Sequence, residues 1–106
     1  MLFRSPGVPP DNDTWISRKV RTVFRYGVST WQMHWTFGGD ENAFRAKNGF
    51  AEQEAGQYAI WGGGVPIRVH GVEGIVAVVA ISGLPHEDDH AAVVEVLTEY
   101  AKNLQA

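Results

Sequence analysis

Hydrophobic residues recur at helical spacing once the chain has left a proline-rich start. Residues 5–13 hold three of the five prolines, and this run of turn formers predicts a connection. Asn12 or Asp13 can then cap a helix that ends at Gly27. The apolar positions on one face of this helix are Ile16, Val20, Val23, Phe24 and Gly27. The opposite face is predicted to be basic, through Arg18, Lys19, Arg21 and Arg25.

A second, shorter helix is predicted directly after the first. Residues 29–32, Ser-Thr-Trp-Gln, form a capping box, and Trp31 and Trp35 lie one turn apart before Gly38 and Gly39 end the helix. From residue 40 to 57 the pattern is weak and polar, with Phe44 and Phe50 as isolated apolar anchors. This stretch is predicted to be a loop with at most one helical turn.

The second half of the chain predicts a β-hairpin followed by a long helix. Residues 58–69 and 75–81 are the two strands, and the second is apolar on both faces, as expected for a strand covered by helices on one side and by a subunit or ligand on the other. Pro85 suits a first helical position, and the acidic residues after it favour a helix N-terminus. The inward stripe of this last helix is predicted to be Val93, Val94, Val96, Leu97, Tyr100, Ala101 and Leu104.

Composition then narrows the class of protein. A chain of 106 residues with 44% hydrophobic residues fits one α+β domain over residues 1–106. A net charge of -3 and a pI near 5.7 argue against nucleic acid as a partner. Without cysteine there is no disulfide, thiolate nucleophile or Cys-ligated zinc. The longest apolar run, residues 75–81, is too short to span a bilayer, and the start of the chain has no apolar signal region, so the expected location is cytoplasmic, without a membrane partner.

The sequence His86-Glu87-Asp88-Asp89-His90 matches the H-E-x-x-H pattern of zinc proteases. Here the pattern straddles a helix start rather than lying inside a helix, so we interpret its carboxylates as partners of the helix dipole and predict no metal site at His86 and His90. His90 alone has two interpretations. It either contacts an anionic ligand near the helix N-terminus, or it caps and packs.

The glycines at 62–64 do not form a phosphate loop, because the required lysine and following helix are missing. They predict a bulge or a close backbone approach, which could also form the lip of a pocket. Arg68, four residues further on, is either an anion ligand or an ion-pair partner. Of the four tryptophans, two are expected at an interface.

Several segments together resemble one family. They are Arg18-Lys19, Phe24-Arg25-Tyr26-Gly27, Gly-Gly-x-Pro-Ile-Arg-Val over residues 63–69, and Ser-Gly-Leu-Pro-x-x-x-Asp-His over residues 82–90. In this order they resemble the haem-degrading-domain-like superfamily, whose members include haem-binding protein S and the glycolate-operon G protein, and above all its uncharacterised cytosolic branch.

The resemblance implies a profilin-like fold, in which helices pack against an antiparallel sheet, and assembly into symmetric multimers. It also implies that a first N-terminal strand and helix are absent here, with Leu2–Ser5 as the end of a strand whose hairpin partner is missing. Haem is a further implied cofactor, although no axial ligand maps onto this sequence, and His34, His70 and His90 are equal candidates.

These observations lead to three hypotheses. The first is an oligomeric module that binds a small anionic ligand in a cleft, with Arg68 and His90 contacting the anion. Its site residues are Arg18, Gly63, Pro66, Arg68, Ser82, Asp89 and His90. The second is haem binding or processing, and the third is an oligomeric adaptor that holds partners through its tryptophans. The sequence assigns no reaction.

Overall fold

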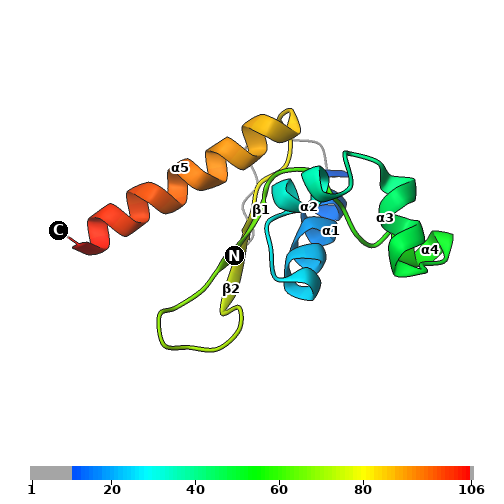
Figure 1. Ribbon diagram of the computed structural model, residues 1–106. Helices are drawn as coiled ribbons and strands as arrows, with labels where there is room; N and C mark the ends of the chain where they lie inside the picture. The colour runs from blue at the N-terminus through cyan, green and yellow to red at the C-terminus, as the bar shows by residue number, and fades with distance from the viewer. Residues whose placement is uncertain (1–10, 106) are drawn as a thin grey trace.

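The computed structural model describes residues 11–105, which fold into five helices and a two-stranded sheet (Figure 1). The helices are α1 (Asp11–Tyr26), α2 (Thr30–Thr36), α3 (Glu41–Asn48), α4 (Glu52–Ala55) and α5 (His86–Gln105). The strands are β1 (Gly64–Ile67) and β2 (Ala77–Ala80), which pair antiparallel with Val65 opposite Val79. The α+β class and the packing of helices against an antiparallel sheet are confirmed.

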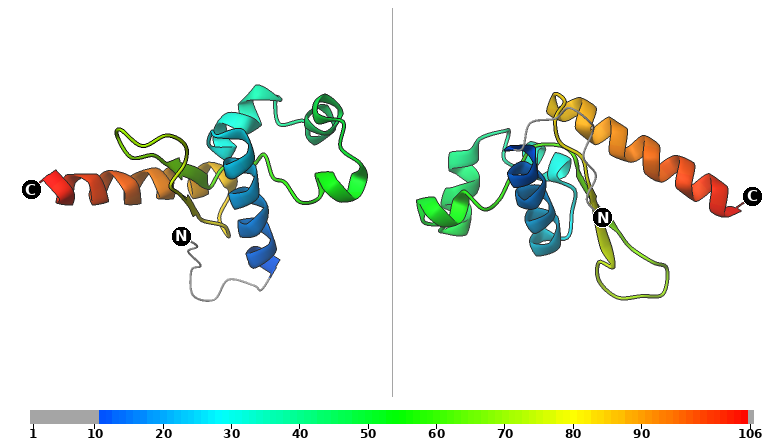
Figure 2. Two further views of the ribbon diagram at one scale, coloured as in Figure 1. Left: turned by 90° about the horizontal axis from the view of Figure 1, so that it is seen from below. Right: turned by 180° about the vertical axis from the view of Figure 1, so that it is seen from behind.

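The sheet separates two groups of helices (Figure 2). Helix α1 contacts both strands, and α5 contacts β1 from another side before it projects away from the rest of the chain. One core cluster, formed by Met33, Phe44, Phe50, Tyr58 and Ile60, holds α2 and α3 together. A smaller cluster of Val79, Ile81 and Val93 joins β2 to α5. Within residues 11–105, no helix combines the length and hydrophobicity that a membrane span needs.

The predicted helix boundaries at 27 and 29 are confirmed. The backbone of Gly27 has a positive φ of 74° after the last residue of α1, a conformation that glycine adopts without strain. The Ser29 hydroxyl accepts a hydrogen bond from the Gln32 amide at 3.0 Å, which caps α2. The predicted start of α1 is wrong, because the helix begins at Asp11 and so includes Asn12 and Asp13, which were predicted to cap it. The segment Leu2–Ser5 lies outside the described residues.

The prediction of a loop over residues 40–57 is wrong, because this stretch contains α3 and α4. The Asp40 carboxylate caps α3 by accepting from the amides of Asn42 and Ala43, and Gly49 ends the helix in the left-handed region at φ 68°. Phe44 is buried in the core cluster and holds the helix in place. Local caps and one buried ring therefore stabilise a helix whose overall pattern is polar.

Two predicted helix faces also need correction. Lys19 was placed on the basic, outward face of α1 but is buried, whereas Phe24 was placed inward and is exposed. On α5, Val93 is buried as predicted, but Val94, Val96, Tyr100 and Ala101 are exposed. For Tyr100 and Ala101, near the end of α5, the reason is length, since a helix of 20 residues spans about 30 Å and a strand of four residues about 13 Å, so α5 outruns the sheet. The side chain of Leu104 lies outside the described residues.

Candidate functional site

A buried ion pair joins the first helix to the last. The Lys19 ammonium lies 3.2 Å from the Asp89 carboxylate, and both side chains are only 3% exposed. Lys19 also donates to the Ile81 carbonyl oxygen at 3.0 Å, while the second Asp89 oxygen accepts from the Leu84 amide at 3.1 Å. The pair therefore fixes the 81–84 turn between α1 and the start of α5.

The three glycines at 62–64 let the chain pass directly beside this pair. A side chain on Gly63 would collide with the Ile81 carbonyl oxygen and come within 2.7 Å of the Lys19 ammonium nitrogen. A side chain on Gly62 would strike the His86 carbonyl oxygen. The glycine run is thus a close approach of the backbone to α1 and α5, one of the alternatives that the sequence left open.

A hollow of about 470 Å³ opens over the ion pair. Lys19 and Asp89 lie on its floor, Trp15 and Trp61 contribute indole rings, and the turn through Ser82, Gly83 and Leu84 completes the lining together with His86. We call this hollow the motif cleft, because the Ser-Gly-Leu-Pro turn and Asp89, both parts of one recognised motif, line it. Its size falls within the range of about 300–1,000 Å³ that is usual for small-molecule sites.

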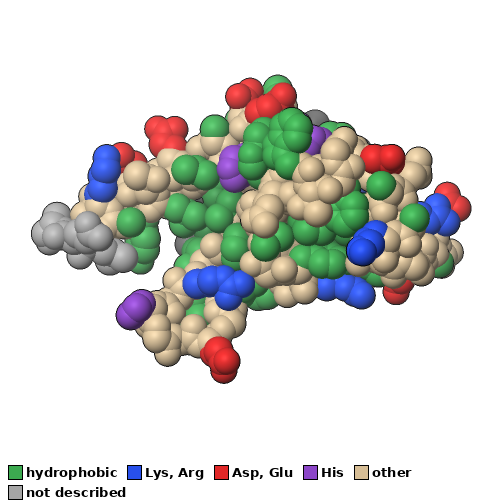
Figure 3. Space-filling view, viewed as in Figure 1, with side chains coloured by type: hydrophobic (Ala, Val, Ile, Leu, Met, Phe, Trp, Pro, Cys, Tyr) green, Lys and Arg blue, Asp and Glu red, His purple; other side chains and the backbone are tan. Residues whose placement is uncertain are grey.

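Histidine and tryptophan rings pack together behind the motif cleft. His90 stacks on Trp31 with ring centroids 5.0 Å apart, and the centroids of His34 and His86 are 4.4 Å apart. The Gly62 amide donates to Nδ1 of His86 at 3.1 Å, so this nitrogen is unprotonated. Figure 3 shows hydrophobic and histidine side chains gathered beside the carboxylates at the start of α5.

Burial shifts the pKa values of the groups around the motif cleft. Desolvation lowers the pKa of Lys19 and raises that of Asp89, and in each case the partner's charge opposes the shift. Desolvation also lowers the pKa of His86, with a further contribution from His34. The pKa of His90 is lowered by burial and by His86. The two histidines are therefore neutral at pH 7.

The structure brings together some of the predicted site residues and separates others. Ser82 and Asp89 line the motif cleft, and Gly63 packs against Lys19 and Asp89 without lining it. His90 lies behind it, with its Nδ1 buried and lacking a hydrogen-bond partner among the described residues.

Three further predicted residues lie elsewhere. Arg18 donates to the Tyr58 carbonyl oxygen at 2.9 Å and lines a different hollow. Pro66 belongs to β1, opposite Val78. Arg68 donates to the Gly27 carbonyl oxygen at 2.9 Å, at the hairpin, so it does not meet His90 in the motif cleft.

Lys19 is a site residue that was not predicted, although the sequence carries a signal for it. Lys19 is three residues after Ile16 and four before Val23, and this spacing puts it on the buried face of α1. A lysine inside an apolar stripe needs a buried counter-ion, and Asp89 was the available acid of the recognised motif. Trp15 and Trp61 were noticed only as members of a tryptophan-rich set.

The fold has a solved counterpart. A crystal structure of the Ybr137w protein superimposes with a TM-score of 0.82 at 31% sequence identity, covering 96% of this chain and 56% of that one. This defines the chain as an α+β domain of the same fold. The chain belongs to the HbpS-like family, described as "Haem degrading protein HbpS-like", whose model matches residues 1–98. The family resemblance inferred from the motifs is confirmed.

Curated relatives extend the family but carry only a family name. The UPF0303 protein of Streptomyces avermitilis is 42% identical over 95 residues, covering 90% of this chain and 56% of the relative. The UPF0303 protein of Psychromonas ingrahamii is 40% identical over 107 residues, covering 97% of this chain and 62% of the relative. The chain thus spans somewhat more than half the length of the relatives that it matches.

The three histidines considered as haem ligands have different surroundings in the described residues. His34 is buried, its Nδ1 lies 3.1 Å from the Ile60 carbonyl oxygen, and Gly39 packs against its Nε2 edge. His90 is stacked against Trp31, and His70 lies exposed in the hairpin loop. The lining of the large apolar groove between the hairpin and α5 includes no histidine. No group of three or more His, Asp or Glu in the described residues is arranged to hold a metal ion.

Proposed function

We propose that the chain is a small-ligand-binding module and that the motif cleft takes a small planar ligand with an anionic group. The single observation that carries this proposal is the Lys19–Asp89 pair at the floor of a hollow walled by two indole rings. A lysine ammonium has three N–H donors, and Ile81 and Asp89 accept two of them, so within residues 11–105 one donor remains for a ligand oxygen.

The start of α5 supports an anionic ligand at the same place. Asp88 and Asp89 donate their amides to the Pro85 carbonyl oxygen, whereas His86 and Glu87 occupy first-turn positions whose amides have no acceptor within the helix. These amides and the helix dipole favour negative charge. Trp15 and Trp61 favour a flat, partly apolar body, because indole faces gain most from stacked rings.

We also propose that the module works as a homo-oligomer, with a second copy covering the groove between the hairpin and α5. This groove has a volume of about 690 Å³, and Figure 3 shows hydrophobic side chains facing it. Its lining includes Val96 and Tyr100, which are 49% and 63% exposed. Arg68 lies at the hairpin edge, and Glu99 lies beside Tyr100 on α5, so the rims of two copies carry complementary charges.

Benzoate is a suitable probe for the motif cleft, because it combines a flat ring with one carboxylate. In a titration followed by NMR, we expect benzoate to shift the indole N–H signals of Trp15 and Trp61, and benzamide, which is uncharged, to shift them less. Trp15→Ala should weaken benzoate binding, while Lys102→Met, a change on the exposed end of α5, should not. Shifts confined to the exposed Trp35, or equal responses to benzoate and benzamide, would refute an anion site in the cleft.

A further inference from the structure

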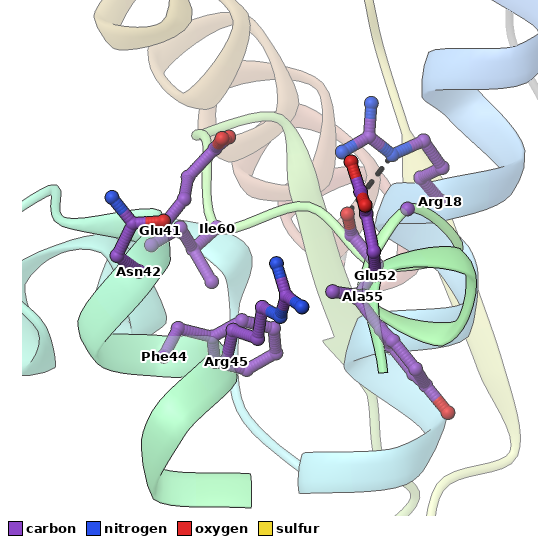
Figure 4. Close-up of a pocket in the computed structure, with 10 residues that line it drawn as sticks. Arg18, Glu41, Asn42, Phe44, Arg45, Glu52, Ala55 and Ile60 are labelled. Carbon is purple, nitrogen blue, oxygen red and sulfur yellow. Dashed lines mark hydrogen bonds between the residues drawn. The ribbon is translucent and has the colours of Figure 1, made fainter. Parts of the chain in front are cut away.

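A second hollow, separate from the motif cleft, lies between α1, α3, α4 and residues 58–60. Its volume is about 190 Å³, well below the range of about 300–1,000 Å³ that is usual for drug-sized ligands. Figure 4 shows Arg45 reaching into this space from α3, with Glu41 on one side and Glu52 and Arg18 on the other. Two cations and two anions therefore surround a small hollow.

The two arginines are held in place through one nitrogen each. Nε of Arg18 donates to the Tyr58 carbonyl oxygen at 2.9 Å, and Nε of Arg45 donates to the Phe50 carbonyl oxygen at 3.1 Å. These bonds fix the guanidinium groups, while their terminal nitrogens make no hydrogen bond to any described residue. Such a fixed terminal fork is suited to a carboxylate, which it can bind through two parallel bonds.

The two glutamates do not neutralise the arginines directly. Glu41 accepts from the indole N–H of Trp61 at 2.6 Å, and the Glu52 side chain makes no hydrogen bond within residues 11–105. Among the described residues, no ion pair joins either glutamate to Arg18 or Arg45. Opposite charges thus line the same hollow without forming an ion pair among residues 11–105, although burial lowers the pKa of Arg18 and the charge of Glu41 opposes this shift by raising it.

From this arrangement we propose that the hollow binds a small amino-acid-like zwitterion. The fork of Arg45 takes the ligand carboxylate, with Arg18 adding positive charge, and the carboxylate of Glu52 takes the ammonium group. Phe44 and Ile60, both buried, provide an apolar surface for a short side chain. The balance of two cations and two anions favours a ligand with no net charge over a simple anion.

This site is adjacent to the motif cleft, and Arg18 lies over the Trp15 ring, with its Cζ 4.1 Å from the ring centroid. Trp61 lines the motif cleft and donates its indole N–H to Glu41, which lines the second hollow. Neither Arg45 nor Glu52 lines the motif cleft. Failure of one proposal therefore leaves the other standing.

The test is calorimetric titration of the protein with L-alanine, and with propionate and ethylamine as probes that carry only one of the two charges. We expect L-alanine to bind more tightly than either probe. Arg45→Gln and Glu52→Gln should each weaken L-alanine binding about tenfold or more, since each removes a charge-assisted contact. The matched controls Lys47→Gln and Glu54→Gln, exposed on the same two helices, should leave it unchanged.

Two results would overturn the proposal. One is no heat of binding with L-alanine, and the other is propionate binding as tightly as L-alanine with no loss in Glu52→Gln, which would indicate a plain anion site. Because Arg45 also holds the Phe50 carbonyl oxygen, Arg45→Gln could loosen α3, so melting temperature is measured alongside. The Glu52 side chain makes no such hydrogen bond in the part of the chain that the structure describes, and its variant keeps the test decisive.

Discussion

Replacing Lys19 by methionine tests the buried ion pair by removing the charge while keeping most of the side-chain volume. The substitution deletes the contacts to Asp89 at 3.2 Å and to the Ile81 carbonyl oxygen at 3.0 Å, and leaves a carboxylate that is 3% exposed without its cation. Breaking a buried pair in this way costs about 3–5 kcal/mol of the free energy of unfolding. For a domain of this size the melting temperature should fall by about 12 °C or more.

Lys102→Met is the matched control, because it makes the same chemical change in an ion pair whose side chains are 69% and 65% exposed. The expected loss there is at most about 0.5 kcal/mol. Both variants are compared with the natural sequence by urea unfolding, followed by far-ultraviolet circular dichroism. Equal stability of Lys19→Met and Lys102→Met would refute the buried pair.

The loss in Lys19→Met should also depend on pH. Burial already raises the pKa of Asp89 above its usual 3.8, and removing Lys19 takes away the charge that opposes this shift. Because the pKa of Asp89 is higher in the folded than in the unfolded state, burying its carboxylate costs no stability below about pH 3.8. This loss of stability appears as the pH rises through the folded-state pKa. The gap in stability between Lys19→Met and the natural sequence should therefore narrow at acid pH, and a gap independent of pH would contradict this reasoning.

Three further predictions concern other parts of the molecule. Gly63→Ala should lower the melting temperature far more than Gly71→Ala, because both have positive φ but only Gly63 has neighbours that a side chain would strike; similar losses would contradict the close approach. Folding lowers the pKa of His86 below its usual 6.5, so the contribution of neutral His86 to stability is present above pH 6.5 and is lost as the pH falls through the folded-state pKa. His86→Asn should therefore reduce the fall in melting temperature at acid pH, and His70→Asn should not. Tyr100→Glu should reduce the particle mass in light scattering, and an unchanged oligomer would exclude the groove as its interface.

Local signals in the sequence were sufficient for most of the secondary structure. Gly27, Ser29 and Pro85 act through their own backbone or side-chain geometry, so the end of α1 and the starts of α2 and α5 could be predicted. The region of α3 failed because its pattern of hydrophobic residues is weak, although Asp40 and Gly49 mark its two ends. For α3, the capping residues at its two ends were a better signal than the spacing of its hydrophobic residues.

The candidate site was only partly predictable, because residues that meet in it are far apart in the sequence. Lys19 and Asp89 are 70 residues apart in sequence, and nothing near Lys19 reveals that its counter-ion lies on the last helix. Conversely, Arg68 and His90 belong to conspicuous motifs but lie in different places, because β1 carries Arg68 away from the start of α5. Motifs identified the family, whereas only the packing of helices on the sheet shows which residues meet.

We propose above that this protein binds a small anionic ligand in the motif cleft, with Lys19 at its floor. The most direct measurement is a crystal structure of the protein soaked with benzoate. We predict ordered density between Trp15 and Trp61 with the carboxylate within hydrogen-bond distance of the Lys19 ammonium. Benzoate bound at another surface, with only water in the motif cleft, would contradict the claim.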